Sequence, residues 1–112
     1  MWLFDLAQIP IVERAVVASA DGLVIEAAGH RGPDPEFLAA EMAALRRALE
    51  GLERRLGGSA RRLVVTLDER ELLAVCEDEI CVGAVIRRGP ERRQVGQELT
   101  RLAERIAAEL GG

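Results

Sequence analysis

Two short β-rich apolar runs near the start of the chain flank the pair Asp21-Gly22. They are Ile11–Ser19 and Leu23–Ala28. Such runs joined by Asp-Gly are typical of a tight β-hairpin, and Asp-Gly suits a type I′ turn, which needs φ above zero at both central residues. Before this hairpin, Trp2–Ala7 is predicted as a short helix packed on a sheet. It ends at the Ile9-Pro10 step because the residue before proline disfavours the α conformation.

A long amphipathic helix is predicted over Asp34–Leu56. Asp34 is a favourable N-cap, Pro35 fits the first turn, and Gly57-Gly58 ends the helix. Large apolar residues form one stripe: Leu38, Met42, Leu45, Leu49, Leu52 and Leu56. A second stripe lies beside it: Phe37, Ala40, Ala44, Ala48 and Gly51. A helix on one sheet needs a single stripe. We favour the same helix of a second copy as the extra contact, and the alternative is a groove in the helix's own monomer.

Three more strands are predicted over Arg61–Leu67, Glu71–Glu77 and Ile80–Ile86. Their polar turns are short, which indicates antiparallel neighbours. The third strand is continuously apolar and is expected at the centre of the sheet, covered on both faces. Two arginines at the start of the first strand are more typical of an edge. A last helix begins at Gly89-Pro90-Glu91, with the apolar stripe Val95, Leu99, Leu102, Ile106 and Leu110.

Length and charge narrow the class of protein. The 112 residues are predicted to form a single domain, 1–112. A net charge of −4 argues against a nucleic-acid partner. No apolar run approaches the roughly 20 residues that span a bilayer, and the N-terminus lacks the features of a signal peptide, so we expect a cytoplasmic protein without membrane insertion. The chain has no Lys and no Asn. This composition suits a thermostable protein, and a GC-rich genome explains it equally well.

The sequence contains few side chains in arrangements typical of catalysis or metal binding. His30 is the single histidine and lies in a Gly-rich loop, where exposure to solvent is more common than catalysis. Neither Ser19 nor Ser59 lies in a nucleophile-elbow sequence. Cys76 and Cys81 are expected to face each other across a hairpin, where a disulfide is conceivable, but we favour two packed thiols because the cytoplasm is reducing. We therefore predict no enzyme, no catalytic residue, no metal and no cofactor.

The run VVASADGLVIEAAG, Val16–Gly29, resembles the first hairpin of Roadblock/dynein light chain domains. The resemblance continues through the long helix, the three-strand meander and the final helix with Gly96 and Leu99 in QVGQEL. It implies an α+β fold, roadblock/profilin-like, with a five-stranded antiparallel sheet. The long central helix would lie on one face, and the N- and C-terminal helices on the other. It further implies a homodimer formed through the long helix and the edge strand that follows it.

The resemblance also implies a function. Bacterial members of the family often bind a Ras-like small GTPase, and eukaryotic members act as scaffolds, without a catalytic site of their own. We therefore expect a non-catalytic homodimeric module that regulates or scaffolds a small GTPase. The expected dimer interface comprises Leu38, Met42, Leu45, Leu49, Leu52, Leu63 and Val65. The expected partner-binding residues are Arg46, Arg47, Glu50, Arg54 and Arg55. The alternative is a small-ligand-sensing or redox-sensing domain that uses Cys76 and Cys81.

Overall fold

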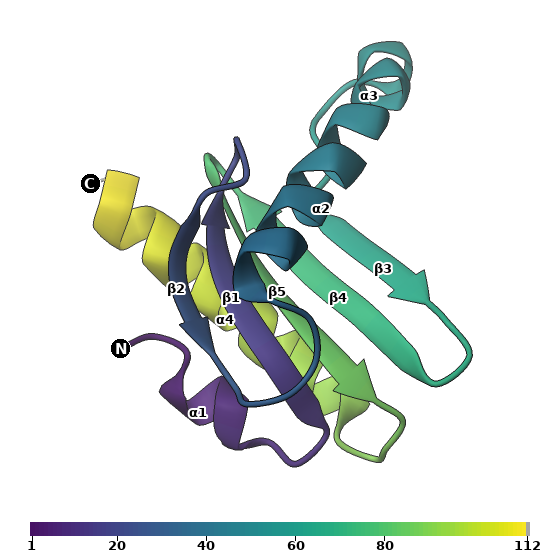
Figure 1. The fold of residues 1–112 in the computed structure, drawn as a ribbon. Helices are drawn as coiled ribbons and strands as arrows, with labels where there is room; N and C mark the ends of the chain where they lie inside the picture. The colour runs from purple at the N-terminus through teal and green to yellow at the C-terminus, as the bar shows by residue number, and fades with distance from the viewer. Residues whose placement is uncertain (112) are drawn as a thin grey trace.

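One five-stranded antiparallel sheet organises the molecule, in a computed structural model that describes residues 1–111 (Figure 1). The strand order is β2-β1-β5-β4-β3. The elements are α1 (Phe4–Gln8), β1 (Val12–Ser19), β2 (Val24–Ala28), α2 (Pro35–Ala48), α3 (Glu50–Leu56), β3 (Arg62–Thr66), β4 (Arg70–Glu77), β5 (Ile80–Arg87) and α4 (Arg92–Gly111). The predicted α+β class and the number of strands are confirmed.

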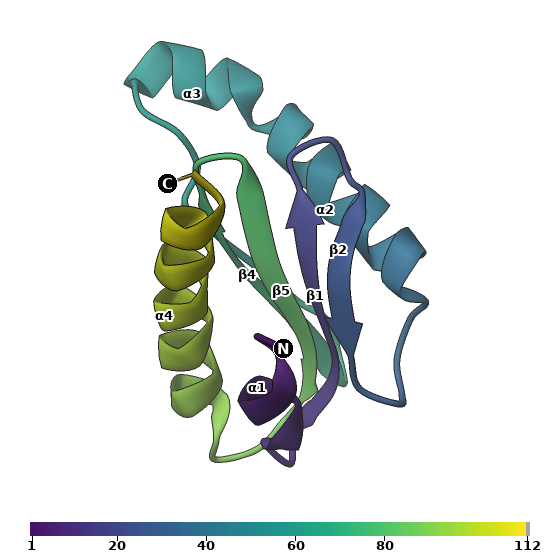
Figure 2. The same ribbon diagram turned by 90° about the vertical axis from the view of Figure 1, so that its left-hand side faces the viewer.

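The helices lie on the two faces of the sheet as expected. Figure 2 shows α1 and α4 on one side and α2 on the other. A larger apolar core fills the α1/α4 side and a smaller one lies under α2. Strand β5 is central and is buried from Ile80 to Ile86, because both cores need its side chains. Strand β3 forms one edge, as its two arginines indicated.

The hairpin is confirmed, but the predicted type I′ turn is wrong. Only Gly22 has a positive φ, of 88°. The Gly22 N–H donates to the Ser19 carbonyl, and the Ser19 N–H donates to the Leu23 carbonyl. Three residues therefore form the loop, and a glycine in the left-handed region closes it, which is the next most common hairpin geometry. Gly22 also lies against α2: a Cβ there would be 3.2 Å from that of Ala43.

The single long helix predicted over Asp34–Leu56 is interrupted at Leu49. Asp34 does cap the start, since its Oδ1 accepts from the Glu36 N–H at 2.8 Å. At Leu49, however, ψ is −4° and the N–H donates to the Arg46 carbonyl, three residues back. This local tightening separates α2 from α3. Gly51, a poor helix former, lies two residues further on and lowers the cost of the break.

The prediction of two packed thiols is wrong, because Cys76 and Cys81 form a disulfide. The two residues are direct partners in the β4–β5 pairing, with Cα atoms 4.0 Å apart. Both are nearly fully buried in the core under α2. The bond therefore fastens the β4–β5 turn beneath the end of α2.

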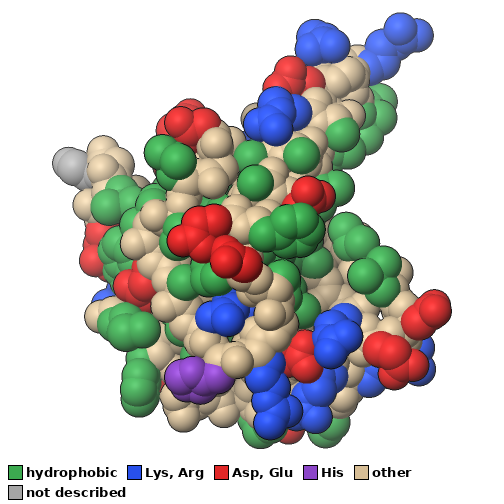
Figure 3. Space-filling model, in the orientation of Figure 1, with side chains coloured by type: hydrophobic (Ala, Val, Ile, Leu, Met, Phe, Trp, Pro, Cys, Tyr) green, Lys and Arg blue, Asp and Glu red, His purple; other side chains and the backbone are tan. Residues whose placement is uncertain are grey.

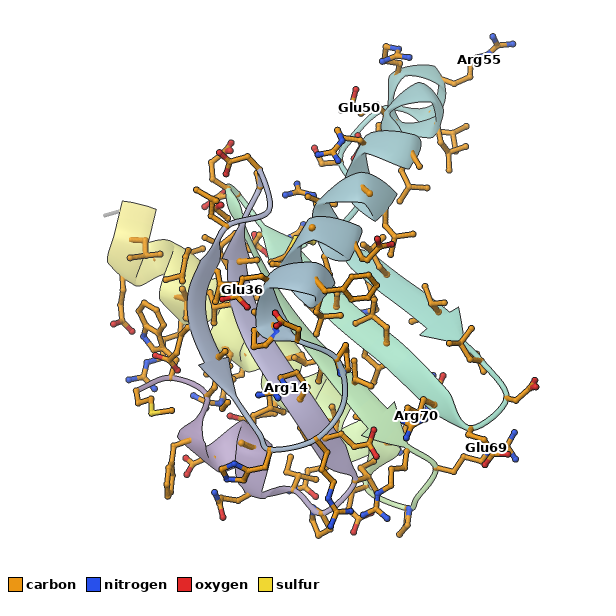
Figure 4. All side chains as sticks on the ribbon, in the orientation of Figure 1. Arg14, Glu36, Glu50, Arg55, Glu69 and Arg70 are labelled. Carbon is orange, nitrogen blue, oxygen red and sulfur yellow. A yellow bond between two sulfur atoms is a disulfide. The ribbon has the colours of Figure 1, made fainter. Side chains whose placement is uncertain are left out.

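The loop that leads into α2 is fastened to β1 by Arg14 (Figure 4). The Arg14 guanidinium donates to the carbonyls of Gly29, at 2.7 Å, and Pro33, at 3.1 Å. The neighbouring Glu13 is buried and accepts from Arg70 at 2.7 Å. These bonds satisfy buried polar groups and hold the start of α2 in place against the sheet.

Candidate functional site

The surface of the helices that faces away from the sheet is apolar along much of its length. We call it the outer apolar face and define it as Phe37, Ala40, Ala44, Ala48, Leu52 and Leu56. All six are exposed, including 58% of Phe37 and 76% of Leu56. Figure 3 shows hydrophobic side chains along this helix and over the neighbouring edge strand. Exposed apolar patches are typical of surfaces that bind another protein.

Helix α3 makes the patch unusual, because none of its residues is buried. It projects past the end of the sheet (Figures 1 and 2). A hydrogen bond from the Ala60 N–H to the Glu53 carboxylate at 2.5 Å ties it to the loop that follows. Short isolated helices are marginal in water. A partner that covers Leu52 and Leu56 would supply the missing packing.

The residues expected at the dimer interface divide into three groups. Leu38, Met42 and Leu63 are buried in the monomer's own core, under α2. Leu45, Leu49 and Val65 are half-buried, whereas Leu52 is 56% exposed. The stripe of large residues therefore packs mostly inward. Phe37 and the alanines of the second stripe, which we did not include among the expected interface residues, form the exposed surface together with Leu52 and Leu56. The sequence did hold a clue to this surface, because the second stripe lies directly beside the stripe of large residues on the helix.

The charged residues expected to bind a partner lie mainly at the far end of the same helices. Arg47, Glu50, Arg54 and Arg55 are exposed, and Figure 4 shows Glu50 and Arg55 on the projecting α3. Arg46 differs, because it is half-buried and lines a small cavity of about 330 Å³ with Ser59 and Glu77. Four of the five expected residues are therefore available to a partner.

Residues 1–111 give little evidence of a site built on His30, of a metal site or of a membrane-spanning helix. His30 is exposed in its loop. The described residues hold no group of His, Cys, Asp and Glu side chains that could bind a metal. In the same part of the chain, no helix is long and apolar enough to span a membrane.

An ion pair on the α4 side links that helix to the sheet. Glu71 of β4 accepts from Arg92 at 2.6 and 3.0 Å and from the Thr66 hydroxyl at 2.8 Å. The Arg92 guanidinium and the Thr66 hydroxyl hold the pKa of Glu71 below its usual range. A carboxylate with a lowered folded-state pKa contributes stability above its unfolded pKa, and this stability is lost as the pH falls.

We expect Glu71→Gln to flatten the acid limb of the stability profile. The wild-type free energy of unfolding should fall more steeply than that of the variant between about pH 5 and pH 3. Urea unfolding across this range measures the difference. Glu69→Gln is the control, because Glu69 is exposed and forms no ion pair within residues 1–111, and it should leave the slope unchanged. Equal slopes for wild type and Glu71→Gln would contradict this account.

Comparison with known proteins gives matches to a family and to solved structures. The family model described as Roadblock/LC7 domain matches residues 2–86. A Roadblock/LC7 domain from Streptomyces avermitilis is 26% identical, with a TM-score of 0.84 over 96% of this chain and 93% of that one. MglB of Myxococcus xanthus is 13% identical, with a TM-score of 0.85 over 98% and 92% of the two chains.

A third structure, described as MglB with tetrameric arrangement, is 18% identical, with a TM-score of 0.79 over 87% of this chain and 76% of that one. The two MglB structures, at these identities, establish similarity of fold. No curated protein matches the sequence.

Proposed function

The chain belongs to the Roadblock/LC7 domain family, and from this premise we propose that it is a homodimeric interaction module that binds a Ras-like small GTPase. The observation that carries the first half of the proposal is α3, a helix without a buried residue that presents Leu52 and Leu56 to solvent. The similar MglB structure with a tetrameric arrangement supports self-association.

The outer apolar face suits close packing of two helices. Ala40, Ala44 and Ala48 repeat at intervals of four residues on α2 and are exposed. Side chains this small let another helix approach closely, while Phe37 and Leu52 at the two ends add apolar area. The adjoining edge strand β3 has backbone groups without a strand partner on its outer side, and it can pair with the same strand of a second copy.

The second half of the proposal concerns the GTPase. The resemblance to bacterial members of the family, which often bind such a partner without a catalytic site of their own, supports this half. Arg47, Arg54 and Arg55 are exposed beside the outer apolar face, where a partner seated on the dimer would meet them. Their permanent charge and planar donors suit carboxylates on that partner.

We expect Leu52→Arg to weaken the dimer. Burying a leucine contributes about 1.5–3 kcal/mol, so the dissociation constant should rise by roughly tenfold to a hundredfold. Sedimentation velocity over a dilution series measures it. Leu110→Arg is the control, since Leu110 is 53% exposed on α4, on the other side of the sheet. A monomeric wild type, or a dimer that Leu52→Arg leaves intact, would refute the self-association proposal.

Binding of a GTPase is tested by affinity capture with this protein from a lysate of the source cells. The capture is run once with GDP and once with a non-hydrolysable GTP analogue. We expect a Ras-like GTPase to be recovered in one nucleotide state if the protein regulates it, and in both if it is a scaffold. Arg54→Glu combined with Arg55→Glu should lower this recovery without changing the oligomeric state. Arg31→Glu, in the exposed loop before α2, is the control for charge reversal away from α3. Absence of any GTPase in both states would contradict the proposal.

A further inference from the structure

A groove of about 780 Å³ lies between α4 and the edge strand β3, on the side of the sheet opposite α2. Its floor is apolar and comprises Leu73 and Val75 of β4 and Val64 of β3. Helix α4 packs over β4 and β5, whereas Val64 remains 50% exposed. Figure 1 shows β3 at the edge of the sheet away from α4. Leu73 and Val75 are only 6% and 7% exposed, so Val64 is the residue of this floor that remains largely uncovered.

The wall that α4 contributes includes two small residues among larger ones. Gly96 and Thr100 lie four residues apart and both line the groove. A Cβ added at Gly96 would meet no other heavy atom within 4 Å. The side chain of Arg62 crosses from β3 and donates to the Thr100 hydroxyl at 2.8 Å. A helix laid along this wall could approach α4 closely, since helices pack about 8–10 Å apart and small side chains permit the shorter distances.

The charge on the rim has the opposite sign to that of the whole chain. Arg62, Arg92, Arg93 and Arg101 line the groove against the single acidic residue Glu104, although the chain carries a net charge of −4. Arg92 is paired with Glu71 and Arg101 with Glu98. Arg62 and Arg93 have no carboxylate partner within residues 1–111. The free charge on the rim is thus positive and calls for an acidic occupant.

We propose that this groove binds an acidic amphipathic α-helix of a partner protein. The apolar side of that helix packs on Val64 and on the small exposed parts of Leu73 and Val75, and its Asp or Glu side chains pair with Arg62 and Arg93. A helix is the fitting element because α1 and α4 already cover the rest of this face, and a third helix extends the same layer. The groove is lined by one protomer and opens on the face opposite the outer apolar face, but β3 is also the edge proposed to pair with a second copy, so the oligomeric state of each variant is measured beside its binding.

The test uses a phage-displayed pool of short amphipathic helical peptides and the 112-residue chain. The pool is first depleted on the variant Gly96→Leu, whose new side chain occupies the groove, and is then selected on the wild type. Gly96→Leu should fold, because the added Cβ meets open space and leucine is a better helix former than glycine. Thermal melting checks this, and Arg93→Glu provides a second variant that changes only the charge of the rim.

We expect enrichment of peptides with Asp or Glu beside apolar residues spaced three and four apart. By fluorescence polarisation, their dissociation constants should rise about tenfold or more on Gly96→Leu and on Arg93→Glu. Ala108→Leu, an exposed position of the same helix, should leave them unchanged. The proposal is overturned if no peptide is enriched, if the enriched peptides lack acidic residues, or if neither groove variant weakens binding. The oligomeric state of each variant, measured in parallel, separates these outcomes from failure of the proposed dimer.

Discussion

Leu102→Ala is expected to lower the free energy of unfolding by about 3–4 kcal/mol, the range for a leucine whose removal leaves a cavity that cannot collapse. Leu102 is 0% exposed at the centre of the core between α4 and the sheet. That core also holds Leu3 and Leu6, so the cavity would open beneath both helices of this face. Urea denaturation monitored by circular dichroism measures the change.

Leu110→Ala is the matched control for this prediction. It makes the same substitution in the same helix, but Leu110 is 53% exposed and leaves no enclosed cavity. Its cost should stay below about 1 kcal/mol, because surface substitutions away from special features change stability little. A Leu102→Ala cost no larger than that of Leu110→Ala would mean that α4 is not packed as described.

Gly29→Ala should destabilise the protein by about 2–4 kcal/mol, since it combines an unfavourable backbone conformation with a direct clash. The φ of Gly29 is +101°, and an added Cβ would lie 2.4 Å from the Glu13 carbonyl oxygen. That oxygen also accepts from the Arg31 N–H at 3.2 Å, so relief of the clash disturbs the loop that leads into α2. For a domain of this size the melting temperature should fall by roughly 10–20 °C, as measured by calorimetry.

Gly57→Ala separates the two causes. Gly57 has a φ of +86°, but a Cβ there would meet nothing within 4 Å. Its ψ is 154°, a backbone region almost restricted to glycine, so this substitution carries the conformational cost alone, about 1–3 kcal/mol. The excess cost at Gly29 measures the contact with Glu13. If both variants melt at the same temperature, the close approach of the loop to β1 contributes nothing to stability.

Local signals predicted most of the fold because its elements have clear ends. Asp34 caps α2, and Gly57 follows α3 with a φ that few other residues adopt. The type of turn in the first hairpin was harder to predict, because it depends on which two residues form the hydrogen-bonded pair that flanks the loop. The pairing of Ser19 with Leu23 places three residues in the loop instead of two. Sequence proximity alone does not fix that register.

The candidate site shows a different limit of sequence reasoning. The spacing of the apolar residues in the sequence predicted which of them share a side of α2. It did not predict which of the two neighbouring sides packs on the sheet. The structure decides this at Gly83 of β5, where an added Cβ would lie 2.7 Å from the Met42 sulfur. The absence of a side chain there admits Met42 and turns Ala44 and Ala48 outward. Such a match joins residues far apart in the chain, so no local pattern reveals it.

The lack of any buried residue in α3 has an evolutionary consequence. Core positions are constrained by folding, whereas a substitution on α3 changes little within its own protomer. Its side chains are therefore free to diverge after gene duplication. In a cell that carries several related chains of this kind, changes at Leu52, Leu56 and the neighbouring charged residues can decide which of these chains pair with one another. The specificity of dimer pairing can then evolve on one short helix while the rest of the domain stays the same.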